Sequence, residues 1–451
     1  MIVAFLTISA VVIVVVVVAN ASFQFIQSTP FSYILASPQS KENVTITVIF
    51  NQFNPKGAGK SLVDSAADKL KSNHPDLGIN IKYIETGTDN NNTRYQILNA
   101  ITNHTSVDIV TLDQIWLGEF AQKGLLTDLT NYTKKWGRQN DWYGVSWDGG
   151  VYNKTVYGIW AWTDVRGIWY WKDLLDEANV DPNSLKTWNG YIESAKKLNS
   201  VLQAKGIQGI HLTGASHSPD LWYPYLWMLG GHIIQYKEGH PTKGGYWYPT
   251  YNSTEGVRAL QFIKDQVNAG IKPQKEHSFG KEFVNRKFAV MIEGSWMPSN
   301  LPKEEFDKFG KNIRFIPMFP VPNNETQTST LAGGWQFNIP VTSSHKNLAW
   351  ELIELMLQPQ ILSPWIGQQG YLPTQTTIGE GSYAKQLRKS IPFYDEIVSM
   401  IPEGGSRPSI PEYPAIAEDI RQALDEVYYG IKEPKQALND AAAKSAKTLG
   451  W

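Results

Sequence analysis

Three acidic residues of this 451-residue chain each lie at the end of an apolar run. Asp113 ends VDIVTLD, Asp164 ends GIWAWTD, and Glu293 is the next-to-last residue of FAVMIEG. Two carboxyl groups on opposite sides of a glycosidic bond can hydrolyse that bond. The same groups can instead accept hydrogen bonds from the hydroxyls of a bound sugar. Because the sequence does not give the separation between these groups, hydrolysis and binding both remain open.

Three tryptophans, Trp116, Trp296 and Trp335, lie near these carboxylates or near glycines. In the stretch STLAGGWQF, Gly333 and Gly334 come directly before Trp335. A tryptophan ring can cover the apolar face of a pyranose, and glycine lets the backbone approach a ligand closely. The chain has as many Trp as Phe, 17 of each, which suits a binding surface as well as a core. These residues predict one wall of a sugar site.

Other chemistries find little support in the sequence. NPKGAGKS, residues 54–61, stands where a phosphate-binding loop would, but it lacks the first glycine of that motif. There is no cysteine, the 8 histidines are scattered, and no G-x-S-x-G motif occurs. The 41 Lys and Arg balance 42 Asp and Glu without a basic block. We therefore expect no metal, no cofactor and no nucleic-acid partner.

The elements that must position these residues alternate between strand and helix. VTITVIF, GINIKYIE and VDIVTLD are predicted strands, and the segments between them have helical periodicity, as in a parallel, doubly wound sheet. After a crossing near Trp162 to Asp164 the alternation begins again, and GGWQFNIPV predicts a strand that returns to the first sheet. We expect a two-lobed α/β fold with a hinge, lobe 1 being residues 44–162 with 334–382 and lobe 2 being 163–333 with 383–451.

The amino terminus predicts export. Residues 2–19 form an uncharged apolar run, so we interpret residues 1–21 as a signal or anchor segment and residues 22–43 as a polar tether. Acceptor sequons for N-glycosylation follow the export segment, which fits an extracellular location. The candidate sites are Asn43, Asn91, Asn103, Asn131, Asn153, Asn252 and Asn324, and the same motif also occurs at Asn20.

Longer stretches carry a resemblance to a known family. TLDQIWLGEFAQKGLLTDLT, FAVMIEGSWMP, LAGGWQFNIPVTSSHKNLAWELIELML and GYLPTQ, in this order, resemble extracellular solute-binding proteins of sugar ABC transporters, the maltose- and trehalose-binding group. The similarity covers roughly residues 44–445. The apolar run and the sequons make the chain most similar to archaeal members, and within these to glucose-binding ones. The resemblance implies two α/β lobes of the periplasmic-binding-protein type II fold that close on a sugar without chemistry.

The resemblance also implies roles for particular residues. Asp113 and Asp164 correspond to sugar-binding aspartates of the family. Trp296 and Trp335 correspond to rings that stack on the sugar, and the backbone at Gly333 or Gly334 reaches the ligand. An arginine in RPSIPEYP, Arg407, contributes in trehalose- and maltose-binding members.

One departure concerns the loop after the first strand, where those members carry an acidic residue. Here the loop is NQFNPKGAGK, which has no carboxylate, so a disaccharide preference is in doubt, although Asn51 or Gln52 could bind a hydroxyl.

These observations lead to one principal functional hypothesis. We expect a monomeric sugar receptor at the extracellular face of the membrane that binds glucose or a related hexose and delivers it to permease subunits. The first alternative is a secreted glycoside hydrolase that uses two of Asp113, Asp164 and Glu293. The second is a surface adhesion protein.

Overall fold

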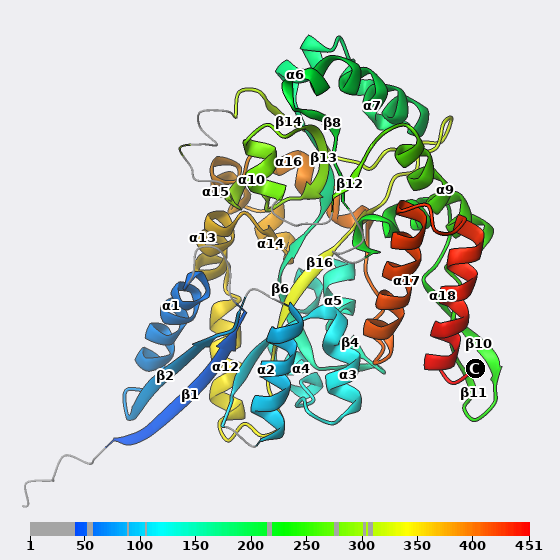
Figure 1. Ribbon diagram of the computed structural model, residues 1–451. Coiled ribbons are helices and arrows are strands. Elements are labelled where there is room, and N and C mark those ends of the chain that lie inside the picture. Colours follow the sequence, from blue (N-terminus) through cyan, green and yellow to red (C-terminus); the bar gives the residue numbers. More distant parts are fainter. Residues whose placement is uncertain are drawn as a thin grey trace, which may run out of the picture. The chain divides into compact units, whose positions relative to one another are not determined.

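The fold was analysed in a computed structural model, shown in Figure 1. The structure describes residues 41–51, 57–87, 90–103, 106–213, 219–274, 279–300, 304 and 310–451. The chain divides into two units, Met1–Lys41 and Glu42–Trp451, and the fold described below is that of the second unit.

The first sheet has six strands in the order β17-β6-β16-β3-β1-β2. Their bounds are β1 Glu42–Phe50, β2 Leu77–Glu85, β3 Ile109–Asp113, β6 Gly158–Asp164, β16 Gly333–Asn338 and β17 Leu372–Pro373. β1 pairs in parallel with β2 and β3, as the alternating pattern predicted. β16, however, is antiparallel to both β3 and β6, so the sheet is mixed. The reason is that β16 enters this sheet from the end at which β6 leaves it.

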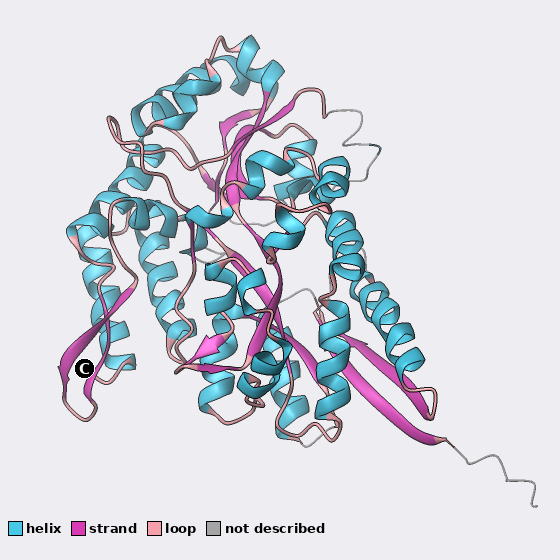
Figure 2. Ribbon diagram, turned by 180° about the vertical axis from the view of Figure 1, so that it is seen from behind, coloured by secondary structure: helices cyan, strands magenta, loops and turns pink. Residues whose placement is uncertain are grey.

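Helices cover both faces of the first sheet because its strands alternate in what they bury. Ile46, Val48 and Phe50 of β1 belong to one apolar cluster, whereas Ile49 belongs to another. Figure 2 shows helices on both sides of these strands. The helices and short strands around this sheet are α1 Ala58–Asn73, α2 Asn90–Thr102, α3 Leu117–Gln122, α4 Thr130–Trp136, α5 Gly144–Asp148, β4 Val151–Tyr152, β5 Thr155–Val156, α12 Lys346–Met356, α13 Pro359–Gln369 and α14 Thr376–Gly379.

The second sheet has four strands in the order β14-β7-β13-β8. Their bounds are β7 Arg166–Trp171, β8 Gln208–Ile210, β13 Phe288–Gly294 and β14 Ile313–Ile316. The surrounding helices are α6 Lys172–Glu177, α7 Trp188–Leu202, α8 Tyr223–Met228, α9 Thr254–Asn268, α10 Phe279–Val284, α17 Tyr413–Tyr428 and α18 Pro434–Thr448. The remaining elements are the strand pairs β9 Leu212–Thr213 with β12 Pro273–Gln274, β10 Ile234–His240 with β11 Gly244–Pro249, and β15 Thr330–Leu331 with β18 Gly404–Gly405, and helices α15 Ala384–Ser390 and α16 Tyr394–Val398.

Capping residues begin two of the helices on the second sheet. The side chain of Thr187 accepts a hydrogen bond from the backbone N–H of Gly190 at the start of α7. Ser253 does the same for Gly256 at the start of α9. Such caps satisfy backbone N–H groups that have no partner within the helix.

The chain first passes between the two sheets through a single residue, because only Val165 separates β6 from β7. It returns through β15, which pairs with β18 outside both sheets, and only Ala332 separates β15 from β16. The two connections are tied together, because the backbone N–H of Arg166 donates to Thr330 Oγ1 at 2.9 Å and that hydroxyl donates to Arg166 O at 2.8 Å. The two-lobed α/β prediction is thereby confirmed, with the crossing one residue after β6 ends.

The lobe boundaries stay a prediction. The sequence assigned residues 383–451 to lobe 2. In the structure Ala384, Leu387, Ile391 and Tyr394 pack in the same apolar cluster as the first sheet, and the chain joins the cluster of the second sheet from Ile397. We propose that lobe 1 extends to about Tyr394.

Among the residues that the structure describes, no helix is long and apolar enough to span a membrane. The predicted signal or anchor, residues 1–21, and most of the predicted tether lie outside the described residues, as does Asn20. Asn252 is partly buried and donates to Asn439 Oδ1 at 2.8 Å. The side chain of Asn91 is not described, and the other candidate sites are exposed: Asn43, Asn103, Asn131, Asn153 and Asn324.

Candidate functional site

Six charged side chains come together where the two sheets meet, and we call them the junction cluster. They are Asp113, Asp164, Arg166, Asp220, Glu293 and Arg407. Asp113 and Asp164 are the last residues of β3 and β6, and Arg166 is the first of β7. Strands of both sheets therefore deliver charged groups to one place, as expected for ligand sites at strand ends in α/β proteins.

The two arginines link the aspartates of the cluster into a chain of ion pairs. Arg407 Nη2 lies 3.1 Å from Asp113 Oδ1, and Arg407 Nη1 lies 3.1 Å from Asp220 Oδ2. Arg166 Nη2 lies 3.7 Å from the same Asp220 oxygen, and Arg166 Nη1 lies 2.6 Å from Asp164 Oδ1. The chain thus runs from the first sheet to the second and back to the first.

Burial dominates the electrostatics of the acidic groups. It raises the pKa of Asp113 although Arg407 opposes the shift, and it raises the pKa of Asp164 against Arg166 and Arg407. Burial also raises the pKa of Glu293, whose Oε1 accepts the Gly294 N–H at 2.8 Å. Groups with perturbed pKa values gather at functional sites, which marks this cluster as a candidate.

The pKa of Arg407 is set by its acidic neighbours. Burial alone would lower the pKa of Arg407, but the negative charges of Asp220 and Asp113 outweigh burial and raise it. Arg407 therefore stays charged, and its guanidinium offers donors to carboxylates or to a ligand.

β16 lies between the two acidic strand ends. In the sheet register Trp335 pairs with Asp113 of β3, and Gly333 pairs with Asp164 of β6. A side chain at position 333 would put its Cβ 2.8 Å from Asp164 Oδ1. At Gly334 a Cβ would lie 2.6 Å from the Trp160 ring. The two glycines thus make room for protein neighbours, and their contact with a ligand stays a prediction.

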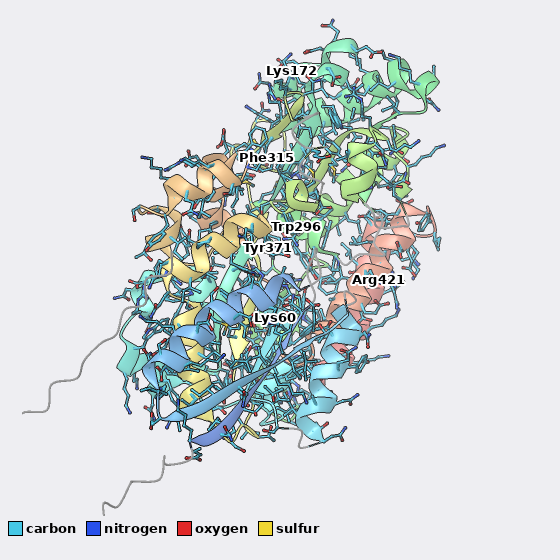
Figure 3. All side chains as sticks on the ribbon, turned by 90° about the vertical axis from the view of Figure 1, so that its left-hand side faces the viewer. Lys60, Lys172, Trp296, Phe315, Tyr371 and Arg421 are labelled. Carbon is cyan, nitrogen blue, oxygen red and sulfur yellow. The ribbon has the colours of Figure 1, made fainter. Side chains whose placement is uncertain are left out.

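The three predicted tryptophans differ in exposure. Trp335 and Trp296 are half-buried, whereas Trp116 is 2% exposed and packs edge-on against Trp335, with ring centroids 5.5 Å apart. The Arg166 guanidinium lies over Trp296, 5.0 Å from the ring centroid. Trp116 is therefore placed to support Trp335 from behind. In the view of Figure 3, Trp296 and Tyr371 lie between Phe315 of the second sheet and Lys60 of α1.

Sequence reasoning missed several residues of this region. Arg166 could have been found, because it lies two positions after Asp164 and a strand repeats its face every two residues. Asp220, in the short helical turn Pro219–Leu221, carries no such signal. Gln114 was also missed: its amide nitrogen lies 2.6 Å from Arg407 O and 2.7 Å from Ser409 Oγ, so it holds the segment that carries Arg407.

The loop after β1 offers little to a ligand where it is described. Thr111 Oγ1 donates to Asn51 Oδ1 at 3.0 Å, which ties this side chain to β3, and Gln52 lies outside the described residues. At the start of α1 the backbone N–H of Gly57 donates to the Glu85 carboxylate at 2.9 Å. A carboxylate thus takes the position that a phosphate would need. Within the described ranges no group of three or more potential metal ligands is found.

Comparison with known proteins gives a consistent result. The sequence model of a family described as bacterial extracellular solute-binding protein matches residues 54–361. A binding protein of Brucella abortus is 25% identical over 357 residues, which are 76% of this chain and 80% of the relative. Two solved structures share the fold. The GacH receptor of Streptomyces glaucescens, studied unliganded and in complex with acarbose, has a TM-score of 0.73 at 20% identity, covering 91% of this chain and 99% of the other.

The second structure is an ABC transporter solute-binding protein of Thermotoga lettingae bound with α-D-tagatose. It has a TM-score of 0.72 at 23% identity, covering 90% of this chain and 100% of the other.

Proposed function

This chain belongs to the family of bacterial extracellular solute-binding proteins, and on that premise we propose that it is the sugar-binding subunit of an ABC importer. Its ligand lies at the junction cluster, and closure of the two lobes presents the loaded receptor to the permease subunits. The observation that carries the proposal is the position of Trp335 beside Asp113, with Gly333 beside Asp164 on the same strand. An aromatic ring on the strand that pairs with both acidic strand ends matches the apolar face and the hydroxyl groups of a sugar.

The balance of charge favours a neutral ligand. The cluster contains four carboxylates, Asp113, Asp164, Asp220 and Glu293, against the two guanidinium groups of Arg166 and Arg407. An anion such as a sugar phosphate would be repelled by the excess negative charge. A neutral polyol supplies hydroxyl donors to carboxylates. The three aspartates keep acceptor capacity beyond the arginines they bind, and Glu293 keeps it beyond the Gly294 N–H.

We assign the residues of the cluster as follows. Asp113 and Asp164 accept hydrogen bonds from sugar hydroxyls, Arg407 donates to the ligand, and Trp335 and Trp296 stack on the ring. Trp116 supports Trp335, Glu293 adds a carboxylate from the second lobe, and the backbone at Gly333 and Gly334 borders the ligand.

The identity of the sugar is the finer part of the proposal. Glucose or a related hexose is our first choice, within the maltose- and trehalose-binding group. That the fold neighbours bind acarbose and α-D-tagatose supports a sugar-sized ligand. We also propose that the protein acts as a monomer at the extracellular face of the membrane, anchored or processed at residues 1–21. An archaeal source stays a prediction.

Glycoside hydrolysis gains no support. The family consists of binding proteins, and in the structure Asp113 and Asp164 are already paired with arginines while Glu293 binds a backbone N–H. Release of reducing sugar from maltotetraose, lost in Asp113→Asn, would revive the enzyme hypothesis.

Titration calorimetry tests the proposal directly. The ligands are glucose, galactose, mannose, maltose and trehalose, with glucose 6-phosphate as the anionic counterpart. We expect saturable heat with at least one neutral sugar and none with the phosphate. Asp113→Asn should weaken binding, whereas Asp395→Asn, which changes an exposed aspartate paired with Arg388, serves as the matched control. Absence of heat with every neutral sugar refutes the proposal.

A further inference from the structure

A cavity lined by aromatic and polar side chains lies on the first lobe, bordered by residues of α4, α12 and the end of α1. We call it the α4–α12 groove. Its volume is about 710 Å³, within the usual range for small-molecule sites of about 300–1,000 Å³. Its lining residues are Asn73, Tyr132, Lys135, Trp136, Asn347, Trp350, Glu351, Glu354, Leu355 and Gln358.

The aromatic residues of the groove form a continuous set of contacts. Tyr132 packs against Trp350 with centroids 5.4 Å apart, and Trp350 meets Trp136 edge-on at 5.7 Å. Trp136 continues to Trp142 at 5.2 Å. Trp350 is buried, whereas Tyr132 and Trp136 are partly exposed along the groove. The buried rings fix the partly exposed ones, which reduces the entropy lost when a ligand packs on them.

Hydrogen-bonding groups hold these rings and retain unused capacity. Tyr132 Oη donates to Asn347 Oδ1 at 2.9 Å, so this hydrogen bond uses the oxygen of Asn347 and not its amide N–H groups. Trp350 Nε1 donates to Glu354 Oε1 at 2.5 Å, and Glu351 binds Asn73 and His74. A carboxylate has about four acceptor positions, so both glutamates can accept further hydrogen bonds.

A neighbouring cavity lengthens the groove. It has a volume of about 500 Å³ and shares Tyr132 and Asn347 with the first, while Glu42 and Leu77 line its far side. Glu42 begins β1, whose other end pairs with the parallel strand β3 that ends at Asp113. A strand of nine residues is about 30 Å long, so the part of the neighbouring cavity at Glu42 is remote from the junction cluster.

We propose that the α4–α12 groove is a second carbohydrate site, which binds a neutral oligosaccharide. Partly exposed rings beside carboxylates and amides repeat the chemistry of the junction cluster. Two glutamates and one lysine line the groove, and the Arg138 guanidinium over Trp136 is neutralised by Asp141, so the charge disfavours phosphates and nucleic acids. Two adjoining cavities suit a ligand longer than one sugar ring. The protein can thus hold a glycan chain at one end of lobe 1 while the junction binds a small sugar.

Ligand-observed NMR and calorimetry on the full chain test this inference, with maltotetraose and cellotetraose as probes. The background variant is Trp335→Ala, which weakens the junction. We expect one of the tetrasaccharides to bind this background, and Trp136→Ala added to it should lower the association constant about tenfold. Glu354→Gln removes a carboxylate from the groove, so it should lower the affinity for the tetrasaccharide. Because the amide oxygen still accepts from Trp350 Nε1, the melting temperature should not change. Tyr236→Ala, at a tyrosine that is 58% exposed on β10, is the matched control.

Three outcomes overturn the inference. The first is the absence of tetrasaccharide binding in the Trp335→Ala background. The second is equal affinity in Trp335→Ala with and without the Trp136 and Glu354 substitutions. The third is a Trp136→Ala variant that changes only the oligomeric state, which would make the groove a self-association surface. A failure of the junction proposal gives another result: Trp335→Ala alone would then leave the binding of both hexoses and tetrasaccharides unchanged.

Discussion

Replacing Arg407 with methionine removes the only link between Asp113 and Asp220 that the ion pairs of the described residues provide. Arg407 is 8% exposed, and Asp113 is 5% exposed. Removing one partner of a buried ion pair while the other stays charged costs about 3–5 kcal/mol. We therefore expect Arg407→Met to lose about that much of the free energy of unfolding at pH 7, measured by urea unfolding with tryptophan fluorescence.

The pH dependence of this loss is a stricter test. Burial already raises the pKa of Asp113, and Arg407 opposes that shift. Without Arg407 the pKa rises further, so the folded variant binds a proton that the unfolded chain releases. Stability from such a group increases as the pH falls, and the deficit of the variant should shrink from pH 7 toward pH 5.

A matched control separates burial from loss of charge. Arg421→Met removes an arginine that pairs with Glu418 and Asp425 on the surface of α17, and exposed pairs contribute only about 0–1 kcal/mol. The reasoning would be refuted if Arg407→Met had the same free energy of unfolding as the wild type at pH 7. It would also be refuted if the difference between the two proteins grew as the pH fell.

Three further predictions concern single positions. Trp335→Ala should lower sugar affinity at least about fivefold in calorimetry, since an aromatic contact contributes on the order of 1 kcal/mol, and unchanged affinity with lowered stability would assign the ring to the core. Gly118→Ala places a Cβ 1.8 Å from Ser409 O, so it should cost at least about 1–3 kcal/mol in urea unfolding, whereas Gly144→Ala, with open space at its Cβ, should be nearly neutral. Burial lowers the pKa of His211 to about 3, so wild-type stability should fall as the pH drops from about 6.5 toward 3; His211→Gln should remove on the order of 3 kcal/mol of that fall by pH 4, and parallel pH profiles would contradict this.

The strands were predictable because their apolar patterns are local. VDIVTLD, GIWAWTD and FAVMIEG form β3, β6 and β13, and their acidic ends meet at the junction. The direction of β16 was not predictable, because it depends on the end at which the chain re-enters the sheet. Periodicity describes a segment and carries no information about that path.

The gathering of the candidate residues was predictable in part, and their role in binding stays a prediction. Asp113, Asp164, Glu293 and Arg407 lie together in the structure, but Asp220 lies 187 positions from Arg407 and nothing local pairs them. Gly334 shows a different limit. Its sequence context suggested close approach to a ligand, yet the nearest occupant of the space is the Trp160 ring, a packing contact that only the assembled sheet reveals.

The position of β16 also bears on how the chain can be synthesised. This strand fills the space between β3 and β6, although Thr163 and Gly333 lie 170 positions apart. While the ribosome makes the second lobe, the first sheet lacks its inner strand, and β3 and β6 present unpaired edges that favour aggregation. The second lobe can complete its four strands in that interval, because they all come from residues 166–316. The order of emergence thus makes the later lobe the first to close its sheet. A fragment that ends before Gly333 would carry five of the six residues of the junction cluster, but it would lack Arg407 and Trp335 and its first sheet would stay open.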